Sequence, residues 1–422
     1  MMKTYSYPQL DEQMQATILP NGLRIYCVPR AGSEKTFAML AADFGSIDCH
    51  FELDGQTHDV TPGIAHFLEH KLFEEEDGNA LQKFSARGAQ PNAFTSHTMT
   101  AYHFTCTDRF YEDLEILLRF VTTPYFTDEN VVKEKGIIGQ EIDMLEDTPG
   151  WAAYVGVLQA LYAVHPVRIS VAGSKQTIAP IDPAVLHLCH RGFYSPKNLA
   201  LVVCGQYDFD RVVELAQRIT PADAAEIAAR SYGEEPETVA QPYWERKMAV
   251  SRPIFMLGCK DDVPDDMYRQ QLVGELAAQC VCGKSTVLYD TLYQRGLVDR
   301  TFDPDYFTFA GGACALFSGE TSDPDAVREA LECEMQRLAD EGVDEAVFRR
   351  TKKALYGKYI RRSSDASGVC RMQVEAVFSG AMAFDFAEVF QSITQTEIVQ
   401  RVRAWVKPNR TAMAVIVPQK EG

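Results

Sequence analysis

The sequence has no long apolar run and no excess of basic residues. No window approaches the ~20 uninterrupted apolar residues that a membrane-spanning helix needs, and the first residues, MMKTYSYPQLDEQM, contain no apolar segment typical of secretion signals. Lys and Arg number 41 against 59 Asp and Glu, which gives a formal net charge of −18. We therefore expect a cytoplasmic protein with no membrane partner and no nucleic-acid partner, because nucleic acids bind basic surfaces.

Closely spaced cysteine pairs are also scarce. The eleven cysteines are scattered over 422 residues, and only Cys280 and Cys282 lie near each other. A zinc ribbon needs two such pairs, and a disulfide scaffold is typical of much shorter secreted chains. We expect the cysteines to be reduced and mostly buried.

The chain is long enough for two domains, and its second half weakly repeats its first. FYSPKNLALVVCG at 193–205 is echoed by WVKPNRTAMAVIVP at 405–418, and the helix predicted from residue 128 is echoed from residue 344, an offset of 216. These echoes predict an α+β protein with two homologous domains, 1–231 and 243–422, joined by the acidic linker 232–242. Under this offset Glu134 and Glu141 fall on Arg350 and Gly357, so the second copy would lack their chemistry.

The segment TPGIAHFLEH, residues 61–70, holds His66, Glu69 and His70 in an H-x-x-E-H pattern. The segment is predicted to be helical through Phe84, with Gly63 opening the helix and Gly78 closing its first part. Residues four apart share one face of a helix, so both imidazoles can bind one cation while Glu69 points at the same cleft. This spacing is the inverzincin variant of the zinc-protease motif. The alternative is a chance pattern of two helix histidines with a surface carboxylate, although unliganded imidazoles among apolar neighbours would be costly to bury.

A catalytic zinc usually has three protein ligands, so one more is needed. The best candidate is Glu141 in VVKEKGIIGQEIDMLED, 71 residues after His70 and flanked by apolar positions. Glu134 lies two helical turns earlier on the same face and could support the site from one layer out. The alternative for Glu134 is a solvated helix face. Thr127 and Asp128 are predicted to cap this helix.

Residues 15–55 are predicted to form strands, with a hairpin turn at Pro20-Asn21-Gly22. Residues 89–107 alternate in strand period and are rich in threonine and aromatic residues, which predicts a strand. His97 and His103 fall in this stretch, and we expect ordinary polar contacts rather than metal ligation from both.

The chain resembles the inverted-zinc metallopeptidases that include pitrilysin, insulysin and the mitochondrial processing peptidase, and most closely their short bacterial members. The matching stretches are GIAHFLEHKLFE, NAFTSHTMTAY, EKGIIGQEIDMLEDTPGW, HPVR and FYSPKNLALVVCG. The resemblance implies two homologous α/β-sandwich domains, each an antiparallel-rich sheet with helices packed on one face. It also implies a zinc endopeptidase that cleaves peptides or unfolded segments in an enclosed chamber.

The same resemblance assigns roles residue by residue. His66, His70 and Glu141 would bind one Zn²⁺ per chain, Glu69 would be the general base, and Glu134 would be a carboxylate behind the ligands. The strand from Asn92 would lie at a sheet edge beside the zinc and accept the substrate as an added strand. Asn92, Ala93, Phe94 and Thr95 are therefore the predicted substrate-binding residues.

The second copy in this family usually carries an Arg and a Tyr, seven apart, that stabilise the oxyanion. In the stretch LYDTLYQRGLVDRTF those positions hold Leu292 and Asp299, while Tyr293 and Arg295 lie nearby in the wrong phase. This departure predicts a heterodimer with a paralogous subunit that carries the Arg/Tyr pair, with a homodimer as the alternative.

Two other functions stay open at this point. Some proteins of this fold are non-catalytic scaffold subunits, although scaffold members tend to lose one or more of the four groups that are all present here. A zinc enzyme that acts on a non-peptide substrate is the third possibility.

Overall fold

The computed structural model describes residues 2–223 and 225–419, which form two compact units. Unit 1 contains the residues up to Ile142, together with Ser170–Ser231 and Ile360–Asp385. Unit 2 contains Asp143–Ile169, Tyr232–Tyr359 and the residues from Phe386. One boundary therefore falls between Ser231 and Tyr232, but each unit also includes a segment from the other half of the chain. The division into contiguous domains 1–231 and 243–422 stays a prediction.

Unit 1 is built on a seven-stranded sheet in the order β1-β2-β3-β11-β4-β10-β9. Its strands are β1 (Lys3–Tyr7), β2 (Glu12–Ile18), β3 (Arg24–Pro29), β4 (Thr36–Ala42), β9 (Gln90–Thr95), β10 (Thr100–Cys106) and β11 (Leu199–Gly205). Strand β4 is buried along its whole length, as a central strand covered on both faces should be. The predicted turn between β2 and β3 is confirmed, because Gly22 has φ +89° and Asn21 Oδ1 accepts the N–H of Leu23 at 3.1 Å.

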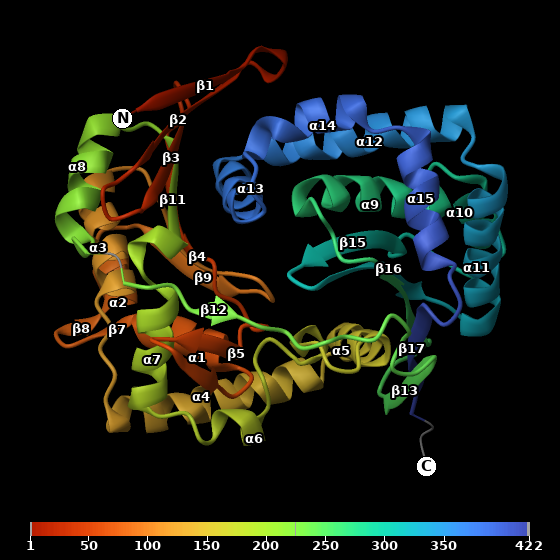
Figure 1. Ribbon diagram of the computed structural model, residues 1–422, viewed down its shortest axis with the longest axis horizontal. Coiled ribbons are helices and arrows are strands. Elements are labelled where there is room, and N and C mark those ends of the chain that lie inside the picture. The colour runs from red at the N-terminus through yellow and green to blue at the C-terminus, as the bar shows by residue number, and fades with distance from the viewer. Residues whose placement is uncertain (1, 224, 420–422) are drawn as a thin grey trace. The chain divides into compact units, whose positions relative to one another are not determined.

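Helices cover both faces of this sheet (Figure 1). One face packs against α1 (Ile64–Leu72), α2 (Ala80–Ser85) and α3 (Phe110–Thr122). The other face packs against α13 (Ala366–Phe378), which contacts β4 and β11 and comes from the second half of the sequence. The remaining strands and α-helices of unit 1 are β5 (His50–Leu53), β6 (Gln56–Asp59), β7 (Glu74–Glu75), β8 (Gly78–Asn79), α4 (Asp128–Glu146, whose residues after Ile142 belong to unit 2), α6 (Lys175–Ile178), α7 (Pro183–Phe193), α8 (Phe209–Ile219) and β12 (Ala229–Arg230).

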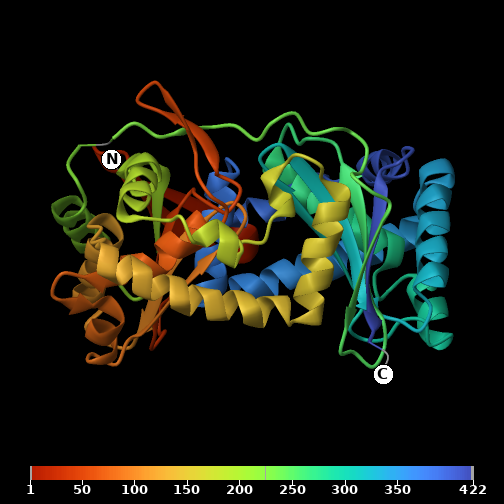
Figure 2. The same ribbon diagram turned by 90° about the horizontal axis from the view of Figure 1, so that it is seen from below.

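Unit 2 has a five-stranded sheet in the order β13-β17-β14-β16-β15. Its strands and α-helices are α5 (Pro149–Leu161), β13 (Tyr243–Met248), β14 (Ile254–Asp261), α9 (Met267–Cys282), α10 (Val287–Gln294), β15 (Asp303–Phe309), β16 (Gly312–Glu320), α11 (Pro324–Glu341), α12 (Glu345–Ser363, whose residues after Tyr359 belong to unit 1), α14 (Phe386–Ser392), α15 (Gln395–Trp405) and β17 (Thr411–Pro418). Figure 2 shows α5, in yellow, on one face of this sheet and helices in blue on the other. The predicted α+β class is confirmed.

The two sheets confirm the internal duplication. In unit 1 the order β3-β11-β4-β10-β9 has one parallel pair, β3 with β11, and only antiparallel pairs elsewhere. Unit 2 repeats this pattern as β13-β17-β14-β16-β15, with β13 and β17 as the parallel pair. Within each unit, one covering helix comes from the opposite half of the sequence: α13 in unit 1 and α5 in unit 2.

The predicted offset between the long helices was wrong by one residue. Helices α4 and α12 begin 345 − 128 = 217 residues apart, and their burial patterns match at that offset. The matched buried positions are Val131, Glu134, Ile138 and Ile142 in α4, and Phe348, Thr351, Leu355 and Tyr359 in α12. Glu134 and Glu141 therefore correspond to Thr351 and Lys358, and the second copy still has no carboxylate at either place.

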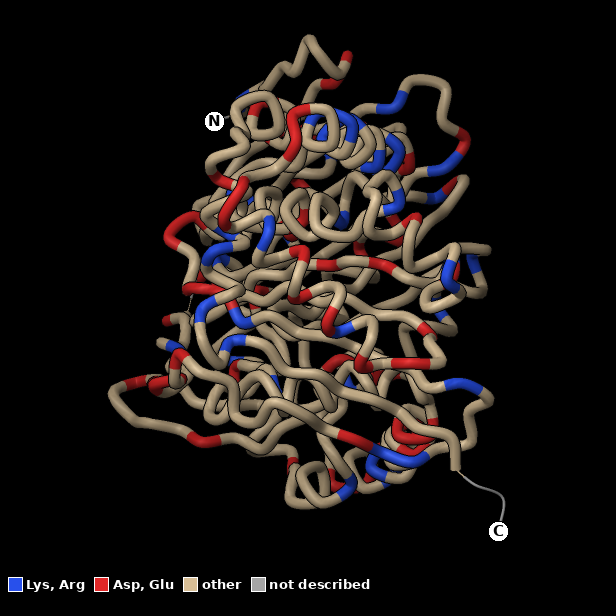
Figure 3. The backbone as a smooth tube through the Cα atoms, turned by 90° about the vertical axis from the view of Figure 1, so that its right-hand side faces the viewer, with Lys and Arg blue, Asp and Glu red and all other residues tan. Residues whose placement is uncertain are grey.

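The predicted acidic linker is fixed within unit 2. The Glu235 carboxylate accepts three backbone N–H groups, from Ala163, Val164 and His165, and pairs with Lys260 Nζ at 2.6 Å. The net charge is spread over the chain rather than concentrated there, because Figure 3 shows acidic and basic residues interleaved along most segments.

All eleven cysteines are free, and all but Cys49 and Cys333 are buried, as predicted. Within residues 2–223 and 225–419, no helix combines the length and the apolar character needed to cross a membrane.

Candidate metal and catalytic site

Helix α1 begins at a point that only glycine can occupy. Gly63 has φ +94°, and a Cβ built there would lie 2.6 Å from the carbonyl oxygen of Ala172. In the opposing loop, Gly173 has φ +70°, and a Cβ built there would lie 2.5 Å from the carbonyl oxygen of Pro62. Left-handed φ values and such close approaches exclude a side chain. This contact fixes where the first turn of α1 starts, and hence where His66 lies.

The helix is shorter than predicted. Its first part ends at Leu72 rather than at Gly78, which lies in the β7–β8 hairpin that follows, and the separate helix α2 begins after that hairpin. Phe73 turns into the core, where it packs on Phe120 and Tyr102, and Gly78 takes φ +141° in the hairpin. Gly78 thus marked the break in the sequence, but the pattern does not show how far before it the first helix ends.

Three predicted ligands meet in unit 1. The rings of His66 and His70 lie 4.7 Å apart between centroids on α1. Helix α4 brings in Glu141, whose Oε1 is 3.5 Å from His66 Nε2 and whose Oε2 is 3.4 Å from His70 Nε2. One ligand atom of each residue lies within 4.8 Å of the other two. We call His66, His70 and Glu141 the His–Glu cluster.

The cluster has the donor set of a zinc site: two imidazole nitrogens and one carboxylate oxygen. His70 and the carboxylates of Glu134 and Glu141 shift one another's pKa values. Burial opposes protonation of His70, but hydrogen bonds to Glu134 and Glu141 raise the pKa of His70 to about 10. Both histidines in turn hold the pKa of Glu141 well below its usual value. Excess negative charge at this point favours a cation, so the residues fit a divalent metal ion.

Glu69 lies beside the cluster without belonging to it. Its side chain is buried, and Oε2 accepts a hydrogen bond of 2.5 Å from Thr95 Oγ1. Burial raises the pKa of Glu69, while the Thr95 hydrogen bond and the two histidines oppose that rise. A carboxylate with a raised pKa can accept a proton near neutral pH and release it again.

Glu134 contacts the ligands from behind. Its Oε1 lies 3.1 Å from His70 Nδ1, the nitrogen that faces away from the cluster, and its Oε2 lies 3.5 Å from Lys71 Nζ. Although burial favours the neutral form, His70 and Lys71 lower the pKa of Glu134. Glu134 is therefore an ionised acceptor for the His70 ring. His66 has no such support, since its buried Nδ1 has no hydrogen-bond partner among the described residues.

The predicted substrate strand forms an edge of the sheet. Strand β9 pairs with β10 on one side and is last in the strand order, and α1 packs against it. The prediction of one continuous strand over 89–107 was wrong, because the chain folds back between Thr95 and Thr100 through a bond from Ser96 N to Met99 O of 2.8 Å. Asn92, Ala93, Phe94 and Thr95 all lie on β9.

The two histidines that follow are not part of the His–Glu cluster. His97 Nδ1 lies 3.1 Å from Ser46 Oγ, which is the expected polar contact, whereas His103 stacks on Phe37 and its buried Nδ1 has no hydrogen-bond partner among the described residues. Burial lowers the pKa of His103 to about 4.

Comparison with known proteins gives one consistent result. Residues 56–175 match the family described as insulinase, peptidase family M16, and residues 180–355 match the M16 inactive domain. An uncharacterized zinc protease of Bacillus subtilis (strain 168), YmfH, is 34% identical over 429 residues, which span 99% of this chain and 100% of that protein. The crystal structure of an M16-like peptidase from Alicyclobacillus acidocaldarius has a TM-score of 0.93 and 32% identity, over 98% of this chain and 100% of that one. This chain belongs to the M16 peptidase family.

More distant structures share the M16 fold alone. The periplasmic protease PqqL from Escherichia coli matches with a TM-score of 0.73 and 17% identity, over 96% of this M16 chain and 47% of PqqL. A chain of complex III2 from Candida albicans matches with a TM-score of 0.78 and 12% identity, over 95% of each chain. The predicted two-domain architecture is thus confirmed.

The sequence prediction missed two charged residues at this M16 site. Lys71 follows His70 directly and is fully buried. Its position, four residues after Phe67 on an apolar helix face, is a signal that could have been read from the sequence. Arg371 on α13 places its guanidinium 4.2 Å from the ring centroid of Phe94. No local pattern indicates that contact, because 277 residues separate the two in the sequence.

The positions where M16 relatives are expected to carry Arg and Tyr contain no oxyanion donor. Leu292 is buried on α10, and Asp299 Oδ1 accepts hydrogen bonds from the Thr301 backbone and hydroxyl. Tyr293 and Arg295 are exposed.

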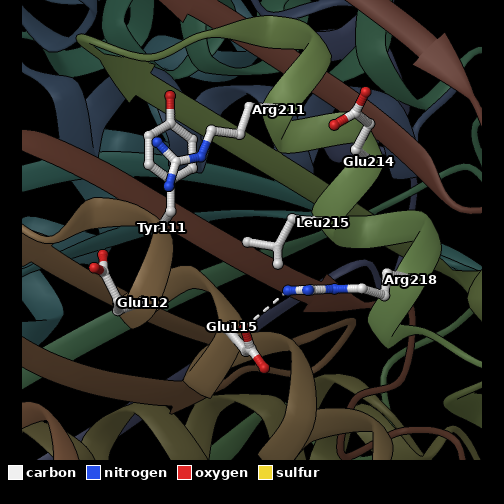
Figure 4. A pocket seen from close by; sticks show the side chains of 7 residues that line it. All are labelled: Tyr111, Glu112, Glu115, Arg211, Glu214, Leu215 and Arg218. Carbon is white, nitrogen blue, oxygen red and sulfur yellow. Dashed lines mark hydrogen bonds and ion pairs between the residues drawn. The ribbon is translucent and has the colours of Figure 1, made fainter.

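A separate hollow of about 340 Å³ lies between α3 and α8 in unit 1. Figure 4 shows Arg211 across the face of Tyr111, 3.7 Å from the ring centroid, and Arg218 paired with Glu115 at 3.0 Å. The remaining lining residues are Glu112, Glu214 and Leu215. The hollow shares no residue with the His–Glu cluster, and its charged lining consists of three glutamates and two arginines.

Proposed function

We propose that this chain is the zinc-bearing, catalytic subunit of an M16 endopeptidase. The observation that carries the proposal is the convergence of His66, His70 and Glu141 on one point, with Glu69 buried beside it. These three residues would hold one Zn²⁺ per chain. The bound zinc would supply Lewis-acid chemistry, polarising a peptide carbonyl and making water a nucleophile near neutral pH.

In the proposed reaction, side chains of this chain transfer protons and hold them in place. Glu69 accepts the proton of the attacking water and later donates it to the nitrogen of the leaving amine. Thr95 donates to Oε2, which leaves Oε1 as the oxygen for proton transfer. Glu134 accepts the Nδ1–H of His70 and thereby keeps Nε2 of that ring turned toward Glu141.

The substrate class follows from the edge strand. A peptide or unfolded segment in extended form can pair with the free edge of β9 through backbone hydrogen bonds, over Asn92, Ala93, Phe94 and Thr95. Thr95 joins this edge to Glu69, so a strand bound there would pass the base. Backbone pairing gives little side-chain preference. An enclosed chamber and a cytoplasmic location remain predictions.

The partner proposal rests on Leu292 and Asp299. An acyl-transfer site that lacks one oxyanion donor loses about 10²–10³ in rate. The missing donors would come from a paralogue of similar length that lacks H-x-x-E-H and carries an Arg and a Tyr seven apart. The similarity to half of PqqL is compatible with such a two-chain enzyme. A homodimer is the alternative.

The test combines metal analysis with hydrolysis of a peptide panel followed by mass spectrometry. We expect about one zinc per chain, loss of cleavage on chelation, recovery with added zinc, and a large gain on adding the paralogue. A zinc-replete protein without bound metal would favour the scaffold alternative. Full activity of the isolated chain, unchanged by the paralogue, would contradict the heterodimer.

A further inference from the structure

Lys71 is the one fully buried lysine among the described residues, and it directly follows the second histidine of the motif. Its Nζ lies 2.7 Å from Glu74 Oε2 and 3.5 Å from Glu134 Oε2. An isolated ammonium group is expensive to bury, and lysine is almost never fully buried unless it is paired. An apolar side chain at this point would fill the same space without that cost, so packing alone does not account for the charge.

The Glu134 carboxylate is shared between two donors. Oε1 lies 3.1 Å from His70 Nδ1, and Oε2 faces Lys71 Nζ. A carboxylate held at both oxygens has a fixed plane, so Lys71 determines the direction from which Glu134 meets the His70 ring. His70 Nε2, on the other side of that ring, faces Glu141 at 3.4 Å.

The other partner of Lys71 anchors the arrangement to the chain. Glu74 lies on β7, which pairs with β8 through Glu74 and Asn79 in the hairpin that follows α1. Contacts thus run in order from Glu74 to Lys71, Glu134, His70 and Glu141. His66 has no equivalent chain, because its Nδ1 is unpartnered among the described residues. The orientation of the two metal-binding histidines therefore depends on the contacts that His70 makes.

We propose that Lys71 is a positioning residue that acts through Glu134 to hold the His70 ring with Nδ1–H toward Glu134 and Nε2 toward the metal. The inference rests on the proposed zinc function, but its primary readout is metal affinity rather than activity. Groups that orient a ligating histidine typically change metal affinity by about 10–100-fold when they are removed.

The experiment measures zinc affinity of the metal-free protein by competition with a chromogenic chelator. We expect Lys71→Met to weaken zinc binding about 10–100-fold, while Lys71→Arg, which keeps the charge, stays within about threefold of the wild type. Lys83→Met is the matched control, because Lys83 pairs with Glu75 and Asp77 on the neighbouring hairpin and, among the described residues, forms no ion pair with Glu134. The Lys83→Met variant should bind zinc with the same affinity as the wild type.

A double-mutant cycle separates positioning from general damage. If Lys71 acts through Glu134, Lys71→Met should have little further effect on zinc affinity in a Glu134→Gln background. Thermal unfolding of the metal-free variants checks that the fold survives, and Lys71→Gln replaces Lys71→Met if the latter does not fold. Unchanged zinc affinity in the neutral variant, or effects that simply add, would overturn the inference. A wild-type protein that binds no zinc would instead overturn the proposed function, and this inference with it.

Discussion

Thr95 on the edge strand β9 donates a 2.5 Å hydrogen bond to Glu69 on helix α1. The contact joins the strand that would receive a peptide to the carboxylate that would activate water. Glu69 is buried beside the His–Glu cluster, so one of its oxygens is fixed by the sheet and the other is left for chemistry. The position of strand β9 and the position of the Glu69 carboxylate therefore depend on each other.

Removing the Thr95 hydroxyl tests this coupling. We expect Thr95→Val, which keeps the side-chain shape, to lower kcat about tenfold, since a hydrogen bond to a charged group contributes about 1.5–3 kcal/mol. Thr95→Ser should retain most of the activity because it keeps the donor. Zinc content should be the same in both variants. Steady-state kinetics on one peptide would decide the matter, and equal kcat values for the valine and serine variants would argue against a role for this bond.

Glu69→Gln should separate metal binding from chemistry. The side chain is not part of the His–Glu cluster, so the variant should retain about one zinc per chain while kcat falls by about 10²–10⁴, the usual contribution of a general base. Glu76→Gln, an exposed neighbour, is the control and should be fully active. Metal analysis and peptide hydrolysis on the same preparations give both readouts. Cleavage by Glu69→Gln at the native rate would remove Glu69 from the mechanism.

Much of the candidate site was accessible from the sequence because its chemistry is encoded locally. Helical spacing places His66 and His70 on one face, and the regular helix that contains both Glu134 and Glu141 makes their separation of two turns informative. The repeat was also readable, although weak echoes left its offset uncertain by one residue. Burial of Glu134 and Thr351, which only the structure provides, sets the offset at 217.

What the sequence did not reveal depends on contacts between distant segments. The end of α1 at Leu72 is decided by Phe73 packing on Tyr102 and Phe120, which lie 29 and 47 residues away. The exchange of α5 and α13 between the two units likewise leaves no mark in local periodicity. Lys71 lies between the local and the long-range features, because the sequence shows its place on an apolar helix face but does not show its contact with Glu134.

The glycine that begins α1 should be intolerant of substitution. In Gly63→Ala, the new Cβ would meet the Ala172 carbonyl oxygen at 2.6 Å in a left-handed backbone conformation. We expect a loss of about 2–4 kcal/mol in the free energy of unfolding, from strain and from displacement of the opposing loop. Gly88→Ala is the control: its φ is +78° with no atom within 4 Å, so only the backbone cost of about 1–2 kcal/mol applies. Equal losses in denaturant unfolding would show that the close approach is unimportant.

A buried carboxylate outside the site should give the protein a pH-dependent stability. Asp113 on α3 is fully buried, and neither oxygen has a hydrogen-bond partner among the described residues. Burial raises the pKa of Asp113 to about 6, above the value of about 3.9 expected in the unfolded chain. The folded state thus binds the proton more tightly than the unfolded state does. Stability contributed by this group is complete below pH ~4 and is lost as the pH rises to about 6.

Asp113→Asn removes this titration and should therefore stabilise the protein at neutral pH. We expect a gain of about 1–2 kcal/mol at pH 7–8, less than the full linkage value because the amide is also buried and the favourable charge near the start of α3 is lost. Below pH ~4 the gain should vanish, since the native carboxyl is then neutral as well. Glu112→Gln, an exposed neighbour on the same helix, should show no such pH dependence. Denaturant unfolding of the wild type and the two variants between pH 4 and 8 provides the measurement. If the stability of Asp113→Asn differs from that of the wild type by the same amount at every pH, Asp113 is ionised at no cost in the folded protein.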